Sequence, residues 1–249
     1  MKTAWIIAVK DMLESFRNKA VYFNIAIMIF LPFPYLDILK NTLAGLAGQG
    51  AGRSEMISAS QAFLANTLYA LPLTLTMLFC TYLSAYAIVL EKAKRTLESL
   101  LSTPTSLRQI WLGKSLAVAL PSILVTYFVL ALTVCVLNFT IIIPRVGSFV
   151  FPGFLPVLVC LFIVPLVAFS VVCIVSILQL TMNNPRFANM VFLFVFIGFY
   201  FFTMTGFSSS WDFSLIYLAV LAVLVLIALF LLRFLTKERV VLSSKGGLG

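Results

Sequence analysis

The chain contains 249 residues, of which 62% are hydrophobic and only 10% are charged, and it carries a formal net charge of +9. Soluble domains are typically about 45–50% apolar and about 25% charged. This composition excludes an ordinary soluble globular protein and indicates a protein whose side chains face lipid. The absence of histidine also argues against a Ser/His hydrolase, histidine-ligated haem and most zinc chemistry. An intramembrane enzyme is therefore a poor candidate.

The apolar residues gather in six stretches that contain no charged residue. The hydrocarbon core of a bilayer is about 30 Å thick and an α-helix rises about 1.5 Å per residue, so a span needs about 20 apolar residues. The stretches are continuous rather than alternating, which favours helices over a β-barrel. The expected spans are residues 20–36, 62–90, 115–138, 154–181, 188–207 and 213–232. We therefore predict an all-α integral membrane protein with six transmembrane helices. Kinks or reoriented helix ends are expected at the prolines within or near these stretches, namely Pro32, Pro34, Pro72, Pro121, Pro156 and Pro165.

The basic residues are divided unequally between the two sides of the predicted bundle. Of the 17 lysines and arginines, only Lys40, Arg53 and Arg145 lie in connections on one side, and the other 14 lie on the opposite side. Because cytoplasmic connections carry an excess of Lys and Arg, this asymmetry predicts that both termini are cytoplasmic. The positive charge is then a topology signal. It makes a nucleic-acid partner unnecessary and predicts a weak attraction to anionic lipid headgroups.

The predicted organisation has three parts: an interfacial amphipathic helix over 1–19, a transmembrane domain over 20–235 and a cytoplasmic tail over 236–249. Apolar residues recur in the first part at helical spacing, namely Trp5, Ile6, Val9, Met12, Leu13 and Phe16. The charged residues expected on the remaining surface of this helix are Lys2, Lys10, Asp11, Glu14 and Arg17. We interpret the segment as a helix that lies along the inner leaflet and anchors the chain, with contact to a cytoplasmic partner as the alternative.

Cysteine and charge patterns narrow the function further. The four cysteines all lie inside predicted spans without CxxC spacing, which indicates reduced packing residues; they are Cys80, Cys135, Cys160 and Cys173. None of the six stretches contains an ionisable Asp, Glu, Lys or Arg. Because ion-coupled carriers use such groups within the membrane, energy coupling by a buried carboxylate is not expected and the driving force must come from elsewhere.

The connection from Glu91 to Lys114 has its own local signals. Its first part can continue the second helix, and Pro104 then breaks that helix. Ser106, with Gln109 three residues later, forms a capping box, so a short helix is expected to begin there and to end at Gly113. Its apolar face is formed by Leu107, Ile110 and Trp111. A helix, a sharp turn and a short transverse helix are the shape needed to press against a cytoplasmic protein.

At these residues the chain resembles the permeases of ATP-binding cassette (ABC) transporters of the type 2 exporter superfamily. The string EKAKRTLESLLSTPTSLRQIWLGK is similar to a family pattern written EKERGTLExLLxTPVSRxEIxLGK. The matching residues are Glu91, Lys92, Thr96, Leu97, Glu98, Leu101, Thr103, Pro104, Ser106, Ile110, Gly113 and Lys114. The chain departs from the pattern at Ala93, Arg95, Thr105 and Gln109. The segment covers about a tenth of the chain, and the predicted spans and cytoplasmic termini agree with the family in outline.

The resemblance implies a permease subunit of an ATP-driven exporter, which docks onto a separate ATPase through the loop between its second and third helices. The residues that it assigns to this coupling contact are Glu91, Arg95, Thr96, Leu97, Glu98, Leu101, Thr103, Pro104, Arg108 and Ile110. It also implies a second permease subunit, in a homodimer or a heterodimer, and the plasma (inner) membrane of a prokaryote. ATP and Mg²⁺ are expected in the partner ATPase, and no cofactor or ATP hydrolysis in this chain. The GKS at 113–115 lacks the P-loop glycine, since position 108 is arginine.

In this family the second and fifth helices line the translocation path. The candidate path residues are Thr74, Thr76, Thr81, Phe192, Phe196 and Phe199, which favours a hydrophobic or amphipathic substrate. The competing interpretation is that the phenylalanines face lipid and the hydroxyls bond to the helix backbone. Two other functions stay open: a secondary transporter or channel without an ATPase, and a membrane scaffold or assembly factor that uses the same loop to hold a partner.

Overall fold

The computed structural model describes residues 2–93, 106–182, 184, 185, 187–191, 193, 194, 197, 198, 213–236 and 240. These residues form helices and short connections, and none of them lies in a β-strand, which confirms the predicted all-α class. The elements are α1 (Lys2–Arg17), α2 (Lys19–Phe30), α3 (Phe33–Gly48), α4 (Arg53–Ser84), η1 (Ala85–Leu90), α5 (Glu91–Ala93), α7 (Leu107–Leu137), η2 (Asn138–Ile142), α8 (Ile143–Val146), α9 (Phe154–Leu158), η3 (Val159–Ile163), α10 (Val164–Thr181), α12 (Phe213–Leu231) and η4 (Leu232–Phe234). η1, η2 and η3 are π-helices, and η4 is a 3₁₀-helix.

Five helical segments are long and apolar enough to cross a membrane, namely Lys19–Gly48, Arg53–Leu90, Leu107–Val146, Phe154–Thr181 and Leu215–Phe234. They correspond to the first four predicted spans and the last one, and they indicate a helical membrane protein. The predicted span 188–207 falls largely outside the described residues. The first segment is longer than the expected span 20–36, because α3 continues past the exposed Asp37 and Lys40.

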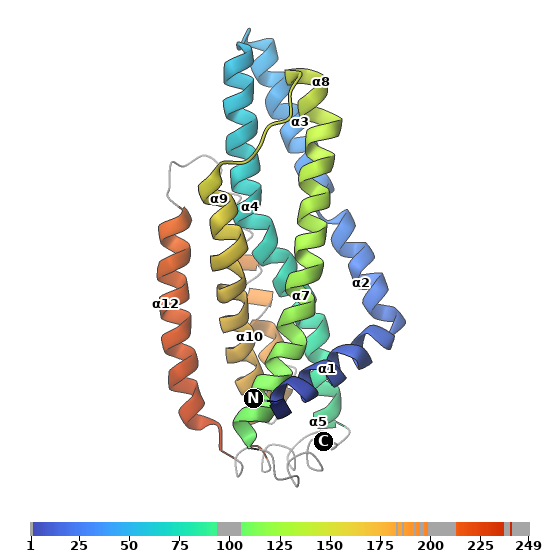
Figure 1. Cartoon of the computed structure of the whole chain (residues 1–249), viewed down its shortest axis with the longest axis vertical. Helices are drawn as coiled ribbons and strands as arrows, with labels where there is room; N and C mark the ends of the chain where they lie inside the picture. The colour runs from blue at the N-terminus through green and yellow to red at the C-terminus, as the bar shows by residue number, and fades with distance from the viewer. Residues whose placement is uncertain are drawn as a thin grey trace.

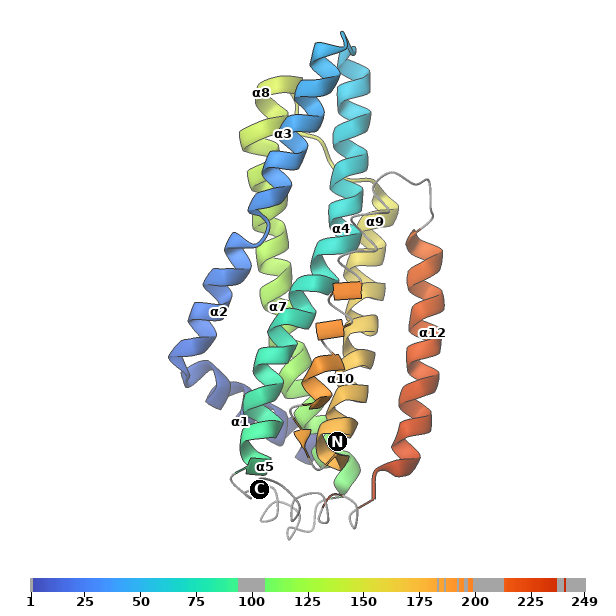
Figure 2. The ribbon, with the colours of Figure 1, turned by 180° about the vertical axis from the view of Figure 1, so that it is seen from behind.

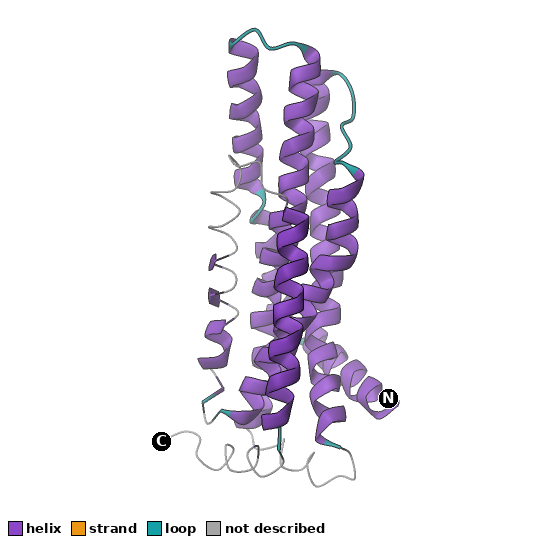
Figure 3. Cartoon of the chain, turned by 90° about the vertical axis from the view of Figure 1, so that its left-hand side faces the viewer, coloured by secondary structure: helices purple, strands orange, loops and turns teal. Residues whose placement is uncertain are grey.

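The centre of the bundle is formed by α4, α7 and α10, with α12 packed against α10 (Figure 1). The helix α1 lies across the lower end in that view, beside the start of α7, and Figure 3 shows it projecting sideways from the bundle axis. Seen from behind, the lower end of α2 lies away from the bundle, and α3 lies beside the upper part of α4 (Figure 2). In Arg53–Leu90, 61% of the most apolar stretch is buried, against 6% in Leu215–Phe234. The outer face of α12 is thus left for lipid.

Several buried serine and threonine hydroxyls in the bundle donate to carbonyl oxygens of their own helices. Thr67 donates to the carbonyl of Phe63 at 2.8 Å in α4, and Ser122 donates to that of Val118 at 2.7 Å in α7. Because lipid offers no hydrogen-bonding partner, such bonds satisfy polar groups that would otherwise be costly to bury. The cysteines are all unpaired, and Cys135 alone of the four is exposed.

Prolines account for most of the irregular helix geometry. Pro32 lies between α2 and α3, and Pro72 lies inside α4, which bends part-way along its length (Figure 2). Pro144 and Pro165 lie in the first turns of α8 and α10, directly after the π-helices η2 and η3. A proline ring clashes with the preceding turn and lacks an N–H donor, so a widened turn before it is expected. Irregular geometry thus occurs at the predicted Pro32, Pro72 and Pro165 and also at Pro144, which was not predicted, whereas the predicted Pro121 lies inside the continuous helix α7.

The predicted capping box is present, but the short transverse helix is not. Ser106 Oγ accepts from the Gln109 backbone N–H at 3.4 Å, and Gln109 Oε1 accepts from the Ser106 N–H at 3.4 Å. The helix that begins there does not end at Gly113 and continues as α7 to Leu137. A glycine inside a helix costs only about 1 kcal/mol relative to alanine. Tertiary contacts around Gly113, described below, outweigh that cost.

Cysteine labelling tests the predicted membrane orientation. Gln49, at the end of α3, and Arg108, at the start of α7, are exposed at opposite ends of the bundle. In a Cys135→Ser background, we expect Arg108→Cys to react with an impermeant maleimide only from the cytoplasmic side, and Gln49→Cys only from the other side. Reaction of both cysteines from the same side would contradict the predicted topology.

Candidate functional site

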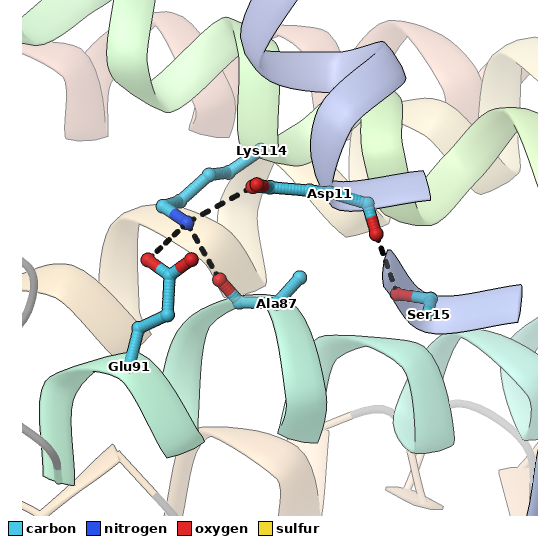
Figure 4. A network of polar contacts seen from close by, with 5 residues as sticks. All are labelled: Asp11, Ser15, Ala87, Glu91 and Lys114. Atoms are coloured by element: carbon cyan, nitrogen blue, oxygen red, sulfur yellow. Dashed lines mark hydrogen bonds and ion pairs between the residues drawn. The ribbon is translucent and has the colours of Figure 1, made fainter. Parts of the chain in front are cut away.

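A buried ionic cluster surrounds the side chain of Lys114, near the start of α7 (Figure 4). Its Nζ atom donates to Asp11 Oδ2 of α1 at 3.1 Å, to Glu91 Oε2 of α5 at 2.6 Å and to the carbonyl oxygen of Ala87 in η1 at 2.7 Å. The side chains of Lys114 and Asp11 are 1% and 4% exposed, whereas that of Glu91 is 25% exposed. One ammonium group therefore joins α1, α7 and the end of the helix formed by α4, η1 and α5.

The cluster uses the full donor capacity of the lysine. An ammonium group has three N–H donors and no acceptor, and the three oxygens around Nζ match that number. A buried ion pair gains little net stability over a well-packed apolar pair, but removal of one partner leaves a buried charge uncompensated at a cost of about 3–5 kcal/mol. Lys114 thus makes one arrangement of the three helices strongly preferred over others.

The helix α1 reaches this lysine because Gly113 allows close contact. A Cβ atom added at Gly113 would lie 2.8 Å from the carbonyl oxygen of Ala4 and 3.0 Å from Ile7 Cβ. The residues that α1 turns inward are small as well, since Ala4 and Ala8 are both buried. Any side chain at position 113 would push α1 away from α7.

The structure corrects the predicted faces of α1. Asp11 and Ser15 are buried together with the two alanines, although Asp11 was expected on the charged surface. Large apolar side chains are instead exposed, with Trp5, Ile6 and Leu13 each more than half accessible. Lipid solvates such side chains as well as a protein core does, so small residues mediate contacts between membrane helices. A helix is therefore present over Lys2–Arg17, but it packs through its small and polar stripe, and its place along the inner leaflet stays a prediction.

Lys92 of α5 makes a second buried contact, at the C-terminal end of α10. Its Nζ atom donates to the carbonyl oxygens of Gln179, Leu180 and Met182 at 3.1, 3.2 and 2.6 Å. The last carbonyls of a helix lack helical donors, and a cation near them is favoured by the helix dipole. Burial lowers the pKa of Lys92 to about 8. Lys92 thereby ties the start of the 91–114 connection to α10.

Asn189, at the start of the predicted fifth span, joins the same region. Its Oδ1 atom accepts from Gln179 Nε2 at 2.5 Å and from Ser84 Oγ at 3.1 Å. This amide therefore links α4, α10 and residues 187–191 at the level of the Lys92 contact.

The structure describes three of the ten predicted coupling residues, and each of the three has different surroundings. Glu91 is bonded to Lys114 within the chain, and Arg108 is exposed at the start of α7. Ile110 is fully buried in the core of this chain, so it packs internally and offers no surface to a partner. The remaining predicted contacts lie outside the described residues; they are Arg95, Thr96, Leu97, Glu98, Leu101, Thr103 and Pro104.

The apolar face of the predicted short helix also packs inside the chain. Leu107 and Trp111 are buried, and Trp111 Nε1 donates to the carbonyl oxygen of Cys173 in α10 at 3.1 Å. The start of α7 therefore turns its apolar side toward α10 rather than toward a cytoplasmic partner.

Two of the predicted path residues on α4 are enclosed within the chain. Thr74 and Thr76 are 1% and 2% exposed. Thr74 Oγ1 donates to the carbonyls of Ala70 and Leu71, and Thr76 Oγ1 lies 3.1 Å from Thr126 Oγ1 of α7. These bonds agree with the interpretation in which hydroxyls satisfy the helix backbone. Thr81 is half-buried, whereas the path candidates Phe192, Phe196 and Phe199 lie outside the described residues.

Among the described residues at this end of the bundle, the buried polar side chains hold helices together. Among the described residues, no group of three or more Cys, Asp and Glu side chains is placed to hold a metal ion. The two carboxylates that do converge, those of Asp11 and Glu91, both face the Lys114 ammonium. The geometry thus suits a joint between helices.

No protein-family model and no curated protein matches the chain.

Removal of the lysine should destabilise the protein far more than neutralisation of its more exposed partner. We expect Lys114→Met to lower the free energy of unfolding by about 3 kcal/mol or more, because the carboxylate of Asp11 then stays buried without a cation. Glu91→Gln should cost about 1 kcal/mol, since its amide oxygen can still accept a hydrogen bond. Thermal unfolding of the purified protein measures the order, with the exposed Lys10→Met as the control. Equal losses for all three variants would contradict the cluster.

A side chain at Gly113 should detach α1 selectively. Gly113→Val places atoms where Ala4 and Ile7 now lie, so we expect the amides of residues 2–17 to exchange faster with deuterium while those of α10 keep their protection. Gly45 in α3 is the matched control, since nothing lies within 4 Å of a Cβ added there. Gly45→Val should leave exchange in α1 unchanged. Unaltered protection of α1 in Gly113→Val would show that the close contact is absent.

Proposed function

We propose that this chain is the transmembrane permease subunit of an ATP-driven ABC exporter, coupled to a separate ATPase through the connection between α5 and α7. The observation that carries the proposal is the role of five residues that match the family pattern. Glu91 pairs with Lys114, Lys92 caps α10, Ser106 caps α7, and Gly113 admits α1. The matched residues that are described here thus build the base of the connection that the resemblance assigns to coupling.

These contacts could transmit a movement of the connection to the transmembrane helices. ATP and Mg²⁺ would bind in the partner ATPase, and closure of two such ATPases would displace the connection. Lys114 carries that displacement to α1 and α7, and Lys92 carries it to α10. Loose side chains would absorb the movement, whereas buried, multiply bonded ones transmit it. Four helices then move together at the cytoplasmic end.

A second permease subunit, identical or homologous, would complete the path in the plasma membrane of a prokaryote. Thr74 and Thr76 are enclosed, whereas Thr81, Tyr82 and Tyr86 on α4 and η1 are only partly buried, and we assign the side toward a second subunit to these three residues. The rings of the two tyrosines are 5.0 Å apart. A partly exposed aromatic pair of this kind suits a hydrophobic or amphipathic substrate.

A secondary transporter is the second candidate, and one observation favours it. Asp11 and Lys114 form a buried ion pair inside a helical membrane protein, and ion-coupled carriers use such groups in their coupling paths. In that case, gradient-driven transport would occur with this chain alone in liposomes. In the exporter, transport would require the ATPase.

The coupling contact can be tested at Leu97, which matches the family pattern. We expect Leu97→Asp to reduce copurification of the ATPase and ATP-driven transport at least tenfold, because a charge in a desolvated contact commonly costs about 2 kcal/mol or more. Ser99→Asp adds the same charge at a variable position of the pattern and should have little effect. The amount of permease in the membrane is measured in parallel, so that a loss of fold is separated from a loss of contact. Normal transport and normal ATPase binding in Leu97→Asp would refute the coupling assignment.

A further inference from the structure

The π-helix η1 differs from the other two in its cause. The π-helices η2 and η3 are each followed within two residues by a proline, Pro144 and Pro165. No proline lies in Ala85–Leu90 or directly after it. A side chain inserted into the hydrogen-bond ladder is another recognised cause of a helix distortion. In the helix formed by α4, η1 and α5, a side chain from α7 bonds to the backbone at this point.

The side chain that bonds to the backbone of η1 is Lys114. Its Nζ atom donates at 2.7 Å to the carbonyl oxygen of Ala87, inside η1, and at 2.6 Å to Glu91, the first residue after η1. Ala87 is itself buried, so this carbonyl has no access to water. The Lys114 ammonium group therefore bonds both to the π-helical turn, at Ala87, and to Glu91, the residue that follows it.

We propose that Lys114 is a positioning residue that holds Ala85–Leu90 in its π-helical register, and that this segment is a register switch at the base of the 91–114 connection. A π-helix accommodates more residues per turn than an α-helix does. If the lysine is withdrawn, the segment can revert to α-helix. That change turns Leu90, at the end of η1, and every residue beyond it by about 100° around the helix axis, which is the angle of one residue.

The proposed rotation of the helix would move the Lys92 side chain. In the π-helical register, this side chain points at the end of α10 and bonds to three of its carbonyls. A rotation of about 100° would carry it away from α10. The two lysines are therefore linked, because the Lys114 contact sets the register in which the Lys92 contact is possible. The role of this switch in ATP-driven transport rests on the proposed function, whereas the register itself does not.

Spin-label distances on the purified permease, without an ATPase, test the register directly. Leu90 and Arg108 are exposed and take the labels, as Leu90→Cys and Arg108→Cys in a Cys135→Ser background. A side chain on a helix lies about 5–6 Å from the axis, so the proposed rotation moves the label at position 90 by about 8 Å. We expect Lys114→Met to shift the measured distance distribution on that scale. The control Lys10→Met should leave it unchanged.

Deletion of Val89 distinguishes a register switch from a simple ion pair. Removal of one residue from η1 converts the π turn to an α turn while keeping Glu91 and Lys92 on their present faces. The deletion alone should therefore leave the distance unchanged, and in the Lys114→Met background it should restore the original distance. Deletion of Ala65 in α4 serves as the control for chain length and should not restore it.

Two results would overturn the proposal: an unchanged distance in Lys114→Met, or a failure of the Val89 deletion to restore it. If Lys114→Met does not fold, the deletion with Lys114 intact decides alone, because a shifted distance there overturns the proposal and an unchanged one supports it. Failure of these measurements leaves the exporter function untouched, and absence of an ATPase partner leaves the register untouched.

Discussion

An ammonium group that is 1% exposed must be surrounded by acceptors, because no water is there to solvate it. At Lys114 these acceptors come from three places in the chain, and the requirement to satisfy one cation fixes all three together. The Asp11 carboxylate brings α1 to the bundle, and the Ala87 carbonyl and the Glu91 carboxylate hold the end of the second long helix. The relative positions of α1, α7 and the end of the second long helix follow from that single group.

The predicted contact of α1 with lipid accounts for the apolar side chains on the outer side of the cluster. In water, α1 would bury its large side chains and expose its aspartate. In a membrane, Trp5 and Leu13 lose nothing by facing outward, so the inward stripe can be small and polar. Ala4 and Gly113 provide the close contact, and Asp11 provides the charge. The same rule leaves the outer surface of α12 covered with leucine and valine.

Local signals could be predicted from the sequence, and contacts between distant segments could not. The Ser106–Gln109 capping box depends on residues three apart, so its pattern identified the start of α7. The continuation of that helix past Gly113 depends on Ala4, far away in the chain, and a glycine by itself suggests an end. Asp11 followed the charged pattern of α1, and only the position of Lys114 reveals why it is buried. The predicted spans end at residue 90 and begin again at residue 115. Glu91 and Lys114 were therefore assigned to the connection, and their burial was not predicted.

Ile110 shows how a family pattern can mix two kinds of residue. A pattern records which residue types recur at a position, whether they hold the base of a loop or contact a partner. Ile110 is buried among the chain's own helices, and Lys114 and Gly113 serve the joint with α1. Residues of this kind maintain the geometry from which a contact is made. The three hydrogen bonds of Lys114 hold the start of the 91–114 connection. Each acceptor is either bonded to the ammonium group or left unpaired, so small intermediate displacements are disfavoured. In the proposed register switch, movement at this joint therefore proceeds in steps, and the smallest step that a helix offers is one residue of register.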